Sequence, residues 1–583
     1  MEDHYRYYDL SRLTAVNAVL AGAGASFVYL LGLAVYRLYF SPIARFPGPK
    51  LAALSFWYEF YYDVVCGGRY WVKIIELHDR YGPIIRINPY ELHVRDPDFY
   101  DVLYSGPGQR RDKWSWSVGM FGNSLSGFGT VPHDLHRQRR AALNPFFGKQ
   151  AIARNMEPLI RDLLHRQLLP RFEALKETGE PLDVLWAYAA LTTDIITKYA
   201  FDTSYRCVDD PDWCREWPQV MVEGTRACHV NKQFAWLHPA MRATPEWIVE
   251  RVNPAVMHII NLQKDLERQI SGLMRQQQQE NEAKRGEKKQ TSEEEEEEGR
   301  SSSNQQQHPA TGTTNIFHEL IGGDLPPEEK TLPRLVDEGQ TMIAAGQETT
   351  SFFLKTVTYY VLADPAIHAR LRAELREHIG RDVATASVAQ LERLPYLRAV
   401  VQEGHRFSHG VVGRLQRISP DAPLRYCCGG DGGDGGKRGG GKEWVIPRGT
   451  PVSMTSLLQH RDPGLFPDPD KFDPERWLLP SPASTSDGNG SSGDSTTEEE
   501  KEARRVKVAS LEKYLVPFSR GTRQCLGLNL ATAEIYLTLA AVFGSERFEM
   551  ELYETTTRDV EVVHDYFIPH GHADSKGVRV VFK

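Results

Sequence analysis

The stretch 517-PFSRGTRQCLG-527 places a single cysteine among glycines and arginines, directly before an apolar helical pattern. A helix N-terminus stabilises a thiolate, which makes Cys525 a candidate metal ligand or nucleophile. Gly521 and Gly527 let the backbone approach something flat and large. Arg523 adds a cation suited to carboxylates. A buried structural thiol is the alternative interpretation.

The bulk composition narrows the class of protein. The chain has 583 residues and a net charge of −8, so it has no basic footprint for nucleic acid. Its 7 cysteines lack both metal-knuckle spacing and the density of a disulfide scaffold. We therefore expect a reducing compartment and no nucleic-acid partner.

The N-terminus predicts a membrane anchor. No charged side chain occurs from Leu13 to Tyr36, a length sufficient to span a bilayer as a helix. Arg37, Arg45 and Lys50 follow this stretch, which predicts that the C-terminal bulk lies in the cytosol. A cleaved signal peptide is the alternative, but the apolar stretch is too long for one.

We expect an anchor and hinge over residues 1–45 and one domain over residues 46–583. Low-complexity insertions interrupt this domain near residues 276–310, 429–442 and 481–505. They are too polar, too rich in glycine or too like-charged to bury area that would offset their ordering entropy. All three are therefore expected to be surface insertions or disordered links.

A long apolar helix is predicted from Thr341 to Leu362, with an unusual centre. Gly346, Glu348 and Thr349 stand where a core helix would prefer leucine. A threonine hydroxyl can bond a carbonyl one turn back and bend the helix, which leaves a groove lined by a hydroxyl and a carboxylate. A bent core helix without function is the alternative.

A second helical segment carries an ion pair. Glu403 and Arg406 lie three residues apart on one helical face, between apolar residues that predict burial. A buried pair needs further hydrogen-bond partners. Arg476, in the segment FDPERW, could complete a triad with Glu403.

Together these motifs resemble the cytochromes P450, of the membrane-anchored microsomal type. The family's haem-binding signature, Phe-x-x-Gly-x-Arg-x-Cys-x-Gly, is similar to the run of Phe518, Gly521, Arg523, Cys525 and Gly527. The resemblance implies a mainly α fold with small β-sheets (α+β), preceded by one transmembrane helix. Residues 46–583 would then form a single P450 catalytic domain.

The resemblance also implies roles for the helical motifs. Cys525 would be the axial ligand of haem b iron, and the groove from Gly346 to Thr349 would hold dioxygen. Thr349 would donate a hydrogen bond to the oxygen, while Glu348 would help to relay protons. Glu403-x-x-Arg406 and Arg476 are similar to structural motifs of the family.

An early helix departs from the family pattern. The family often has Trp-x-x-x-Arg contacting haem, and the counterpart here is His136 and Arg140. Arg417 resembles another propionate-binding arginine. Arg137 and Arg139 form either a basic face that meets an acidic reductase or a solvated face.

The activity implied is that of a monooxygenase that hydroxylates or epoxidises an apolar small molecule with O₂. Electrons must come from outside, because we find no dinucleotide fingerprint or flavin domain, so an NADPH-cytochrome P450 reductase at the endoplasmic reticulum membrane is the implied partner. Several segments resemble the trichodiene oxygenase group, which predicts a terpenoid or other fungal secondary metabolite. The segment Trp114 to Gly129 should lie over the distal haem face. A reductase-independent P450-like isomerase or dehydratase and a non-catalytic haem-binding protein are the alternatives.

Overall fold

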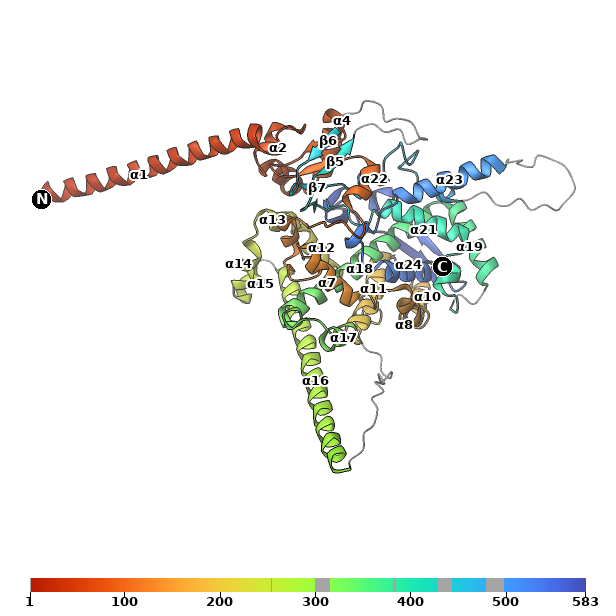
Figure 1. Ribbon diagram of the computed structural model, residues 1–583. Helices are drawn as coiled ribbons and strands as arrows, with labels where there is room; N and C mark the ends of the chain where they lie inside the picture. Colours follow the sequence, from red (N-terminus) through yellow and green to blue (C-terminus); the bar gives the residue numbers. More distant parts are fainter. Residues whose placement is uncertain (1, 253, 299–314, 381–383, 428–442, 479–497) are drawn as a thin grey trace.

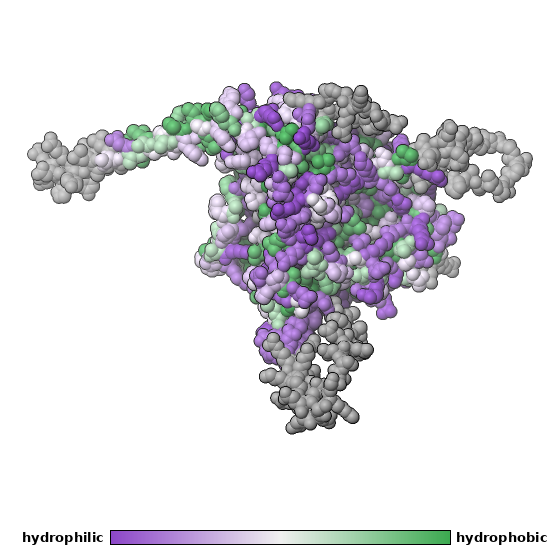
Figure 2. Space-filling view, in the orientation of Figure 1, coloured by the Kyte–Doolittle hydropathy of each residue, from purple (hydrophilic) through white to green (hydrophobic). Residues whose placement is uncertain are grey.

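The computed structural model describes residues 2–252, 254–298, 315–380, 384–427, 443–478 and 498–583. It is mainly helical with four small sheets, which confirms the predicted fold class (Figure 1). Helix α1 (Glu2–Val35) projects from the body, and residues Val16–Phe40 are long and apolar enough to cross a membrane. Figure 2 shows hydrophobic side chains along α1 near the body, whose visible face is mostly hydrophilic. The position and composition of α1 agree with the predicted anchor.

The centre of the body is built on two long helices, α11 (Val184–Phe201) and α18 (Leu332–Ala363). Helix α11 is buried on nearly all sides, as expected for a helix that is apolar around most of its circumference. A Cβ atom at Gly346 of α18 would lie 3.0 Å from Ile196 of α11. The missing side chain therefore lets the two helices approach closely, a packing role additional to the predicted groove.

Other helices surround this pair. The C-terminal helix α24 (Leu528–Gly544) follows the Cys525 loop and is buried along most of its length. The remaining helices are α2 (Lys50–Leu54), α3 (Trp57–Phe60), α4 (Tyr70–Tyr81), α5 (Tyr100–Leu103), α6 (Ser115–Val118), α7 (His133–Leu143), α8 (Lys149–Asn155), α9 (Glu157–Leu163), α10 (Leu169–Thr178), α12 (Glu216–Arg226), α13 (Cys228–Gln233), α14 (Leu237–Ala243), α15 (Glu246–Val252), α16 (Pro254–Glu298), α17 (Ile316–Gly322), α19 (Pro365–Ile379), α20 (Val388–Leu391), α21 (Pro395–Ser408), α22 (Ser456–His460), α23 (Glu498–Tyr514) and α24 (Leu528–Gly544).

The largest sheet has the strand order β1-β2-β7-β4. Strands β1 and β2 pair antiparallel with Ile85 opposite His93 and so form a hairpin. Strands β9 and β10 form a two-stranded hairpin that reaches the cavity described below. The strands are β1 (Ile84–Arg86), β2 (Leu92–Val94), β3 (Leu182–Asp183), β4 (Arg417–Ile418), β5 (Leu424–Cys427), β6 (Glu443–Ile446), β7 (Pro451–Ser453), β8 (Met550–Leu552), β9 (His564–Tyr566), β10 (Ile568–His570) and β11 (Arg579–Phe582).

The first low-complexity segment contains a helix that the sequence analysis did not predict. Helix α16 continues through Gln276 to Glu298, where we expected a surface insertion or a disordered link. Glutamine, glutamate and lysine are good helix formers, and pairs one turn apart, such as Gln276 with Glu280 at 3.2 Å, support the helix. Residues 299–310, residues 429–442 and most of residues 481–505 lie outside the described residues.

Candidate active site

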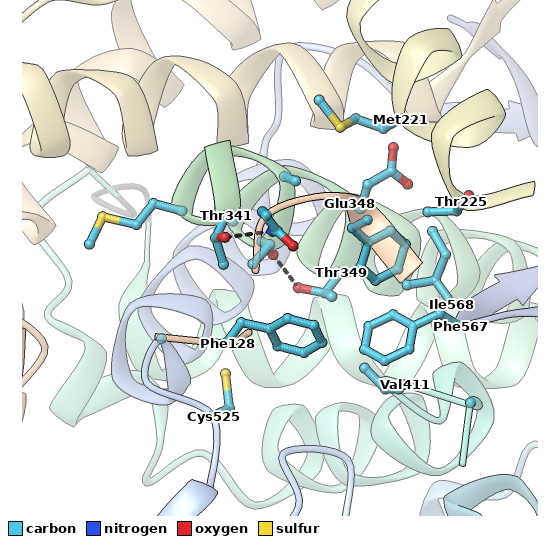
Figure 3. Close-up of a pocket in the computed structure, with 18 of the residues that line it drawn as sticks. Phe128, Met221, Thr225, Thr341, Glu348, Thr349, Val411, Cys525, Phe567 and Ile568 are labelled. Carbon is cyan, nitrogen blue, oxygen red and sulfur yellow. Dashed lines mark hydrogen bonds between the residues drawn. The ribbon is translucent and has the colours of Figure 1, made fainter. Parts of the chain in front are cut away.

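A cavity of about 830 Å³ lies in the body, between α18, the Cys525 loop and the β9–β10 hairpin. Cys525, Thr349, Phe128 and Phe567 are among the residues that line it (Figure 3). The Cys525 sulfur points toward the side of the cavity on which α18 places Thr349. The structure therefore brings the two central motifs of the sequence to one space.

The geometry of the Cys525 loop depends on glycine. Gly521 has φ +75°, and a Cβ atom there would lie 2.2 Å from the carbonyl oxygen of Ser105. Only glycine fits this backbone, for both conformational and steric reasons. The Cys525 N–H donates to the Phe518 carbonyl at 2.9 Å, which closes the loop beneath the thiol. The Phe518 ring in turn packs edge-on against His405.

The surroundings of the thiol influence its charge in opposite directions. Burial raises the pKa of Cys525, while a hydrogen bond from the Gly527 N–H and the nearby Arg140 guanidinium lower it. Arg140 donates to the Gln524 carbonyl at 2.6 Å and to the Cys525 carbonyl at 3.4 Å. These contacts fix the loop backbone and place a cation next to the sulfur.

Glu348 and Thr349 lie on the cavity side of α18 but point in different directions. The Thr349 hydroxyl donates to the Ala345 carbonyl at 2.9 Å, which is the one-turn bond expected from the sequence. The Glu348 carboxylate points toward Met221 and Thr225 (Figure 3). Burial raises the pKa of Glu348 to about 8, so this group is protonated at neutral pH.

Three buried cations line the same cavity and bond only to carbonyl oxygens. Lys113, Arg417 and Arg523 form no ion pair with any described residue, and burial lowers the pKa of each of them. The nearby charge of Arg417 also disfavours the charged form of Arg523, and the pKa of Arg523 falls to about 9. Their backbone acceptors are the carbonyls of Arg111, Thr130 and Val131 for Arg523, of Leu415 and Gln416 for Arg417, and of Phe128 for Lys113.

His136 completes this group, which we call the cationic edge: Lys113, His136, Arg417 and Arg523. The His136 side chain is buried and its Nδ1 has no hydrogen-bond partner among the described residues. Burial lowers the pKa of His136 to about 2, with a further contribution from Arg523, so the ring is neutral. The sequence did not predict Lys113, although the basic run from residue 110 to 113 could have pointed to it.

The cationic edge fits the group that the P450 resemblance implies. Haem carries two propionates, and buried cations without carboxylate partners need such anions. The orphaned Nδ1 of His136 can donate a further hydrogen bond, and Cys525 offers a sulfur ligand in the same cavity. The residues present therefore suit a flat dianionic group held by Cys525.

Away from the cavity lining, Glu403 accepts hydrogen bonds from three side chains and one backbone N–H. Arg406 binds it through two nitrogens at 2.8 and 3.0 Å, and Arg476 lies at 3.4 Å. The Trp477 indole donates at 2.8 Å, a contact that the sequence did not predict. We call Glu403, Arg406, Arg476 and Trp477 the Glu403 cluster. Arg406 also donates to three carbonyls, those of His460, Pro469 and Lys471.

Arg139 is not part of a surface patch, so the expectation that it faces a reductase or solvent is wrong. Its guanidinium is buried and binds both carboxylate oxygens of Glu329, at 2.6 and 2.9 Å. It also donates to the Thr130 hydroxyl at 2.8 Å. Its neighbour Arg137 is exposed and remains available to a partner.

The segment from Trp114 to Gly129 reaches the cavity from Phe121 onward. Phe121 and Phe128 line the cavity, whereas the Trp114 ring stacks near Phe56.

Glu534 of α24 also lines the cavity, and burial raises its pKa to about 8, partly offset by a hydrogen bond with Thr350. The sequence did not single out Glu534, because a glutamate in an apolar helix carries no motif of its own.

Known proteins similar to this chain agree with the geometry. The family model described as "Cytochrome P450" matches residues 47–565. A tryptophan 6-hydroxylase of Fusarium equiseti is 40% identical over 94% of this chain and 94% of its own length. A cytochrome P450 monooxygenase of Ascocoryne sarcoides is 40% identical over 96% of this chain and 98% of its own length. An N-acetyltryptophan 6-hydroxylase of Emericella nidulans is 39% identical over 95% of both chains.

The family model spans residues 47–565, and the relatives align with more than nine-tenths of the chain. The family model and the relatives confirm the prediction of a cytochrome P450 monooxygenase. The narrower resemblance to trichodiene oxygenases stays a prediction. The chain therefore belongs to the cytochrome P450 family.

Proposed function

We propose that this chain is a haem-thiolate monooxygenase that oxidises a small, largely apolar molecule of fungal secondary metabolism. The observation that carries the proposal is the shared cavity, in which the Cys525 thiol faces the side of α18 that bears Glu348 and Thr349. Cys525 would hold the haem iron, and the cationic edge with Arg140 would hold the propionates. In the product, one atom of O₂ is retained and the other leaves as water.

Haem bound through sulfur supplies the iron at which dioxygen is cleaved, because a thiolate ligand favours that cleavage. Thr349 offers a hydroxyl beside the space above Cys525, next to the close helix contact at Gly346. Glu348 holds a proton at neutral pH, because burial raises its pKa to about 8. We propose that the pair passes protons from solvent to the reacting oxygen, with Glu348 as donor and Thr349 as the hydrogen-bonding group.

The remaining partners follow from the anchor and from the need for electrons. An apolar helix over Val16–Phe40 would hold the enzyme at the endoplasmic reticulum membrane, where an NADPH-cytochrome P450 reductase supplies electrons. Two substrate classes compete. Segment resemblance favours a terpenoid, whereas two of the relatives are named as hydroxylases of tryptophan and N-acetyltryptophan. The relatives favour an aromatic substrate over a terpenoid.

The test uses the full chain loaded with haem and the Cys525→Ala variant. The ferrous wild type under carbon monoxide should show the red-shifted Soret band of thiolate ligation, and the variant should lose it. Turnover of an apolar substrate panel should require O₂, NADPH and reductase, and should fall to background in Cys525→Ala. A normal Soret shift with turnover that needs neither O₂ nor reductase would identify an isomerase or dehydratase instead. A normal Soret shift with no turnover of the panel in the complete system would indicate a non-catalytic haem protein.

A further inference from the structure

One wall of the cavity is formed by three phenylalanine rings in contact. The ring centroids of Phe121 and Phe567 are 5.1 Å apart at 77°, and those of Phe128 and Phe567 are 5.6 Å apart at 82°. All three side chains line the cavity, and Figure 3 shows the rings of Phe128 and Phe567 next to each other. Edge-to-face contacts between aromatic rings contribute more binding energy than their buried area alone predicts. A wall of such rings therefore favours another aromatic ring.

Phe567 is held in a strained backbone conformation. Its φ is +76°, which is an outlier for a bulky residue. Three hydrogen bonds maintain it: the Phe567 carbonyl accepts from Val412 and Gly413, each at 3.0 Å, and its N–H donates to Asp565 at 2.8 Å. Glycine would adopt this backbone without strain, whereas the phenylalanine present here brings a ring to the cavity.

Asn123 contributes a bare acceptor close to this wall. The Thr341 hydroxyl donates to the Asp337 carbonyl at 2.8 Å, so it can only accept from the Asn123 amide, whose nitrogen lies 2.7 Å away (Figure 3). This arrangement fixes the amide with its nitrogen on Thr341. The opposite atom, Oδ1, is buried and has no partner among the described residues. An N–H or O–H donor on a ligand would satisfy it.

The charges near this end of the cavity do not favour an anionic substrate. Arg226 pairs with Glu223 at 2.8 Å, and Arg242 lies 3.9 Å from Asp337 and donates to the Gly122 carbonyl. The cationic edge is already assigned to the propionates. The His238 ring, which also lines the cavity, has a buried Nε2 without a hydrogen-bond partner among the described residues.

We propose that the substrate is a neutral, flat aromatic molecule with a hydrogen-bond donor. Its ring packs on the wall of Phe121, Phe128 and Phe567, and its N–H or O–H donates to Oδ1 of Asn123. This inference rests on the proposed function, because it names the substrate class of that same site. Asn123 and Phe567 are thus specificity-determining residues, one for the donor and one for the ring.

Binding spectra of the haem-loaded full chain test both parts. The isomers 3-methylindole and 1-methylindole differ in the N–H, and naphthalene and limonene have the same number of carbons but differ in aromaticity. In the wild type, 3-methylindole should bind about tenfold more tightly than 1-methylindole, as one buried hydrogen bond predicts. Naphthalene should bind about two- to tenfold more tightly than limonene.

Variants separate these effects from general damage. Asn123→Leu should abolish the preference for 3-methylindole, and Thr341→Val, which removes the bond that orients the amide, should weaken it, whereas Met221→Leu should leave it unchanged. Phe567→Leu should reduce the preference for naphthalene, whereas Met221→Leu elsewhere in the lining should not. Equal binding of the two methylindoles by the wild type, or tighter binding of limonene, overturns the proposal. A carbon monoxide Soret band that is still red-shifted in that case shows that only the substrate class failed.

Discussion

The Glu403 cluster and the cationic edge are both buried groups of charge, but the chain supplies a counter-ion only in the first. Glu403 accepts five hydrogen bonds from protein donors, and Arg406 uses three further carbonyls. Among the described residues, the cationic edge has only carbonyl acceptors for its three cations and an unpartnered His136 nitrogen. The contrast separates a cluster that supports the fold from one that awaits a ligand.

The largest effect is expected from removing the carboxylate of the Glu403 cluster. Glu403→Leu leaves the buried Arg406 without its counter-ion, which should lower the free energy of unfolding by about 3–5 kcal/mol. Chemical denaturation of the full chain measures this loss. The control is Glu549→Gln, which removes the exposed partner of Arg372 and should cost under about 1 kcal/mol. Equal losses in the two variants would mean that the Glu403 cluster is not the stronger support.

The Glu348 carboxyl, which lines the same cavity as the cationic edge, should affect turnover rather than folding. Glu348 accepts no hydrogen bond from the described residues, and burial raises its pKa to about 8. If it donates protons, turnover should fall as the pH rises through about 8, because the carboxylate formed there has no proton to give. Glu348→Gln should lower turnover about 100-fold and remove this alkaline decline.

Glu534 provides the matched control for that profile, because burial also raises its pKa to about 8. Glu534→Gln should keep the alkaline decline if Glu348 causes it. A decline that persists in Glu348→Gln and disappears in Glu534→Gln would transfer the role to α24.

A change within the cationic edge should affect haem retention more than folding. Arg417→Leu removes a cation that has no carboxylate partner among the described residues, so the free energy of unfolding without haem should change by less than about 1 kcal/mol. The loss of charge-assisted bonds to a propionate should speed haem dissociation about ten- to hundredfold. Transfer of haem to an acceptor globin measures the rate. An unchanged rate would show that the cationic edge does not hold the propionates.

The smallest effect is expected from removing the Trp477 indole of the Glu403 cluster. Trp477→Phe removes one of five hydrogen bonds to Glu403 and keeps an aromatic ring in the same site, so it should cost only about 1 kcal/mol. Thermal unfolding checks this value. A loss as large as that of Glu403→Leu would mean that the indole, rather than Arg406, is the main partner of Glu403.

The sequence predicted those parts of the site that follow one another along the chain. The Cys525 loop, the Glu348–Thr349 pair and the Glu403–Arg406 spacing each lie within a few residues, so local geometry sets their relation. The fold class and the apolar anchor were also predictable, because hydrophobic length and periodicity carry that information. The helical continuation of α16 was missed, because helix propensity outweighed the expected disorder of a polar run.

Other parts depended on contacts between distant segments. The sequence predicts Arg139 to be a surface cation, because its ion-pair partner, Glu329, lies far along the chain. Lys113 and Arg417 both belong to the cationic edge because separate segments of the chain meet at the cavity. Phe121 and Phe567 form one wall for the same reason. Local spacing thus determined the family and its reacting groups, whereas burial determined which charges are balanced and which still need a ligand. The reason is that desolvation depends on everything packed around a group, and the sequence order of its neighbours does not reveal it.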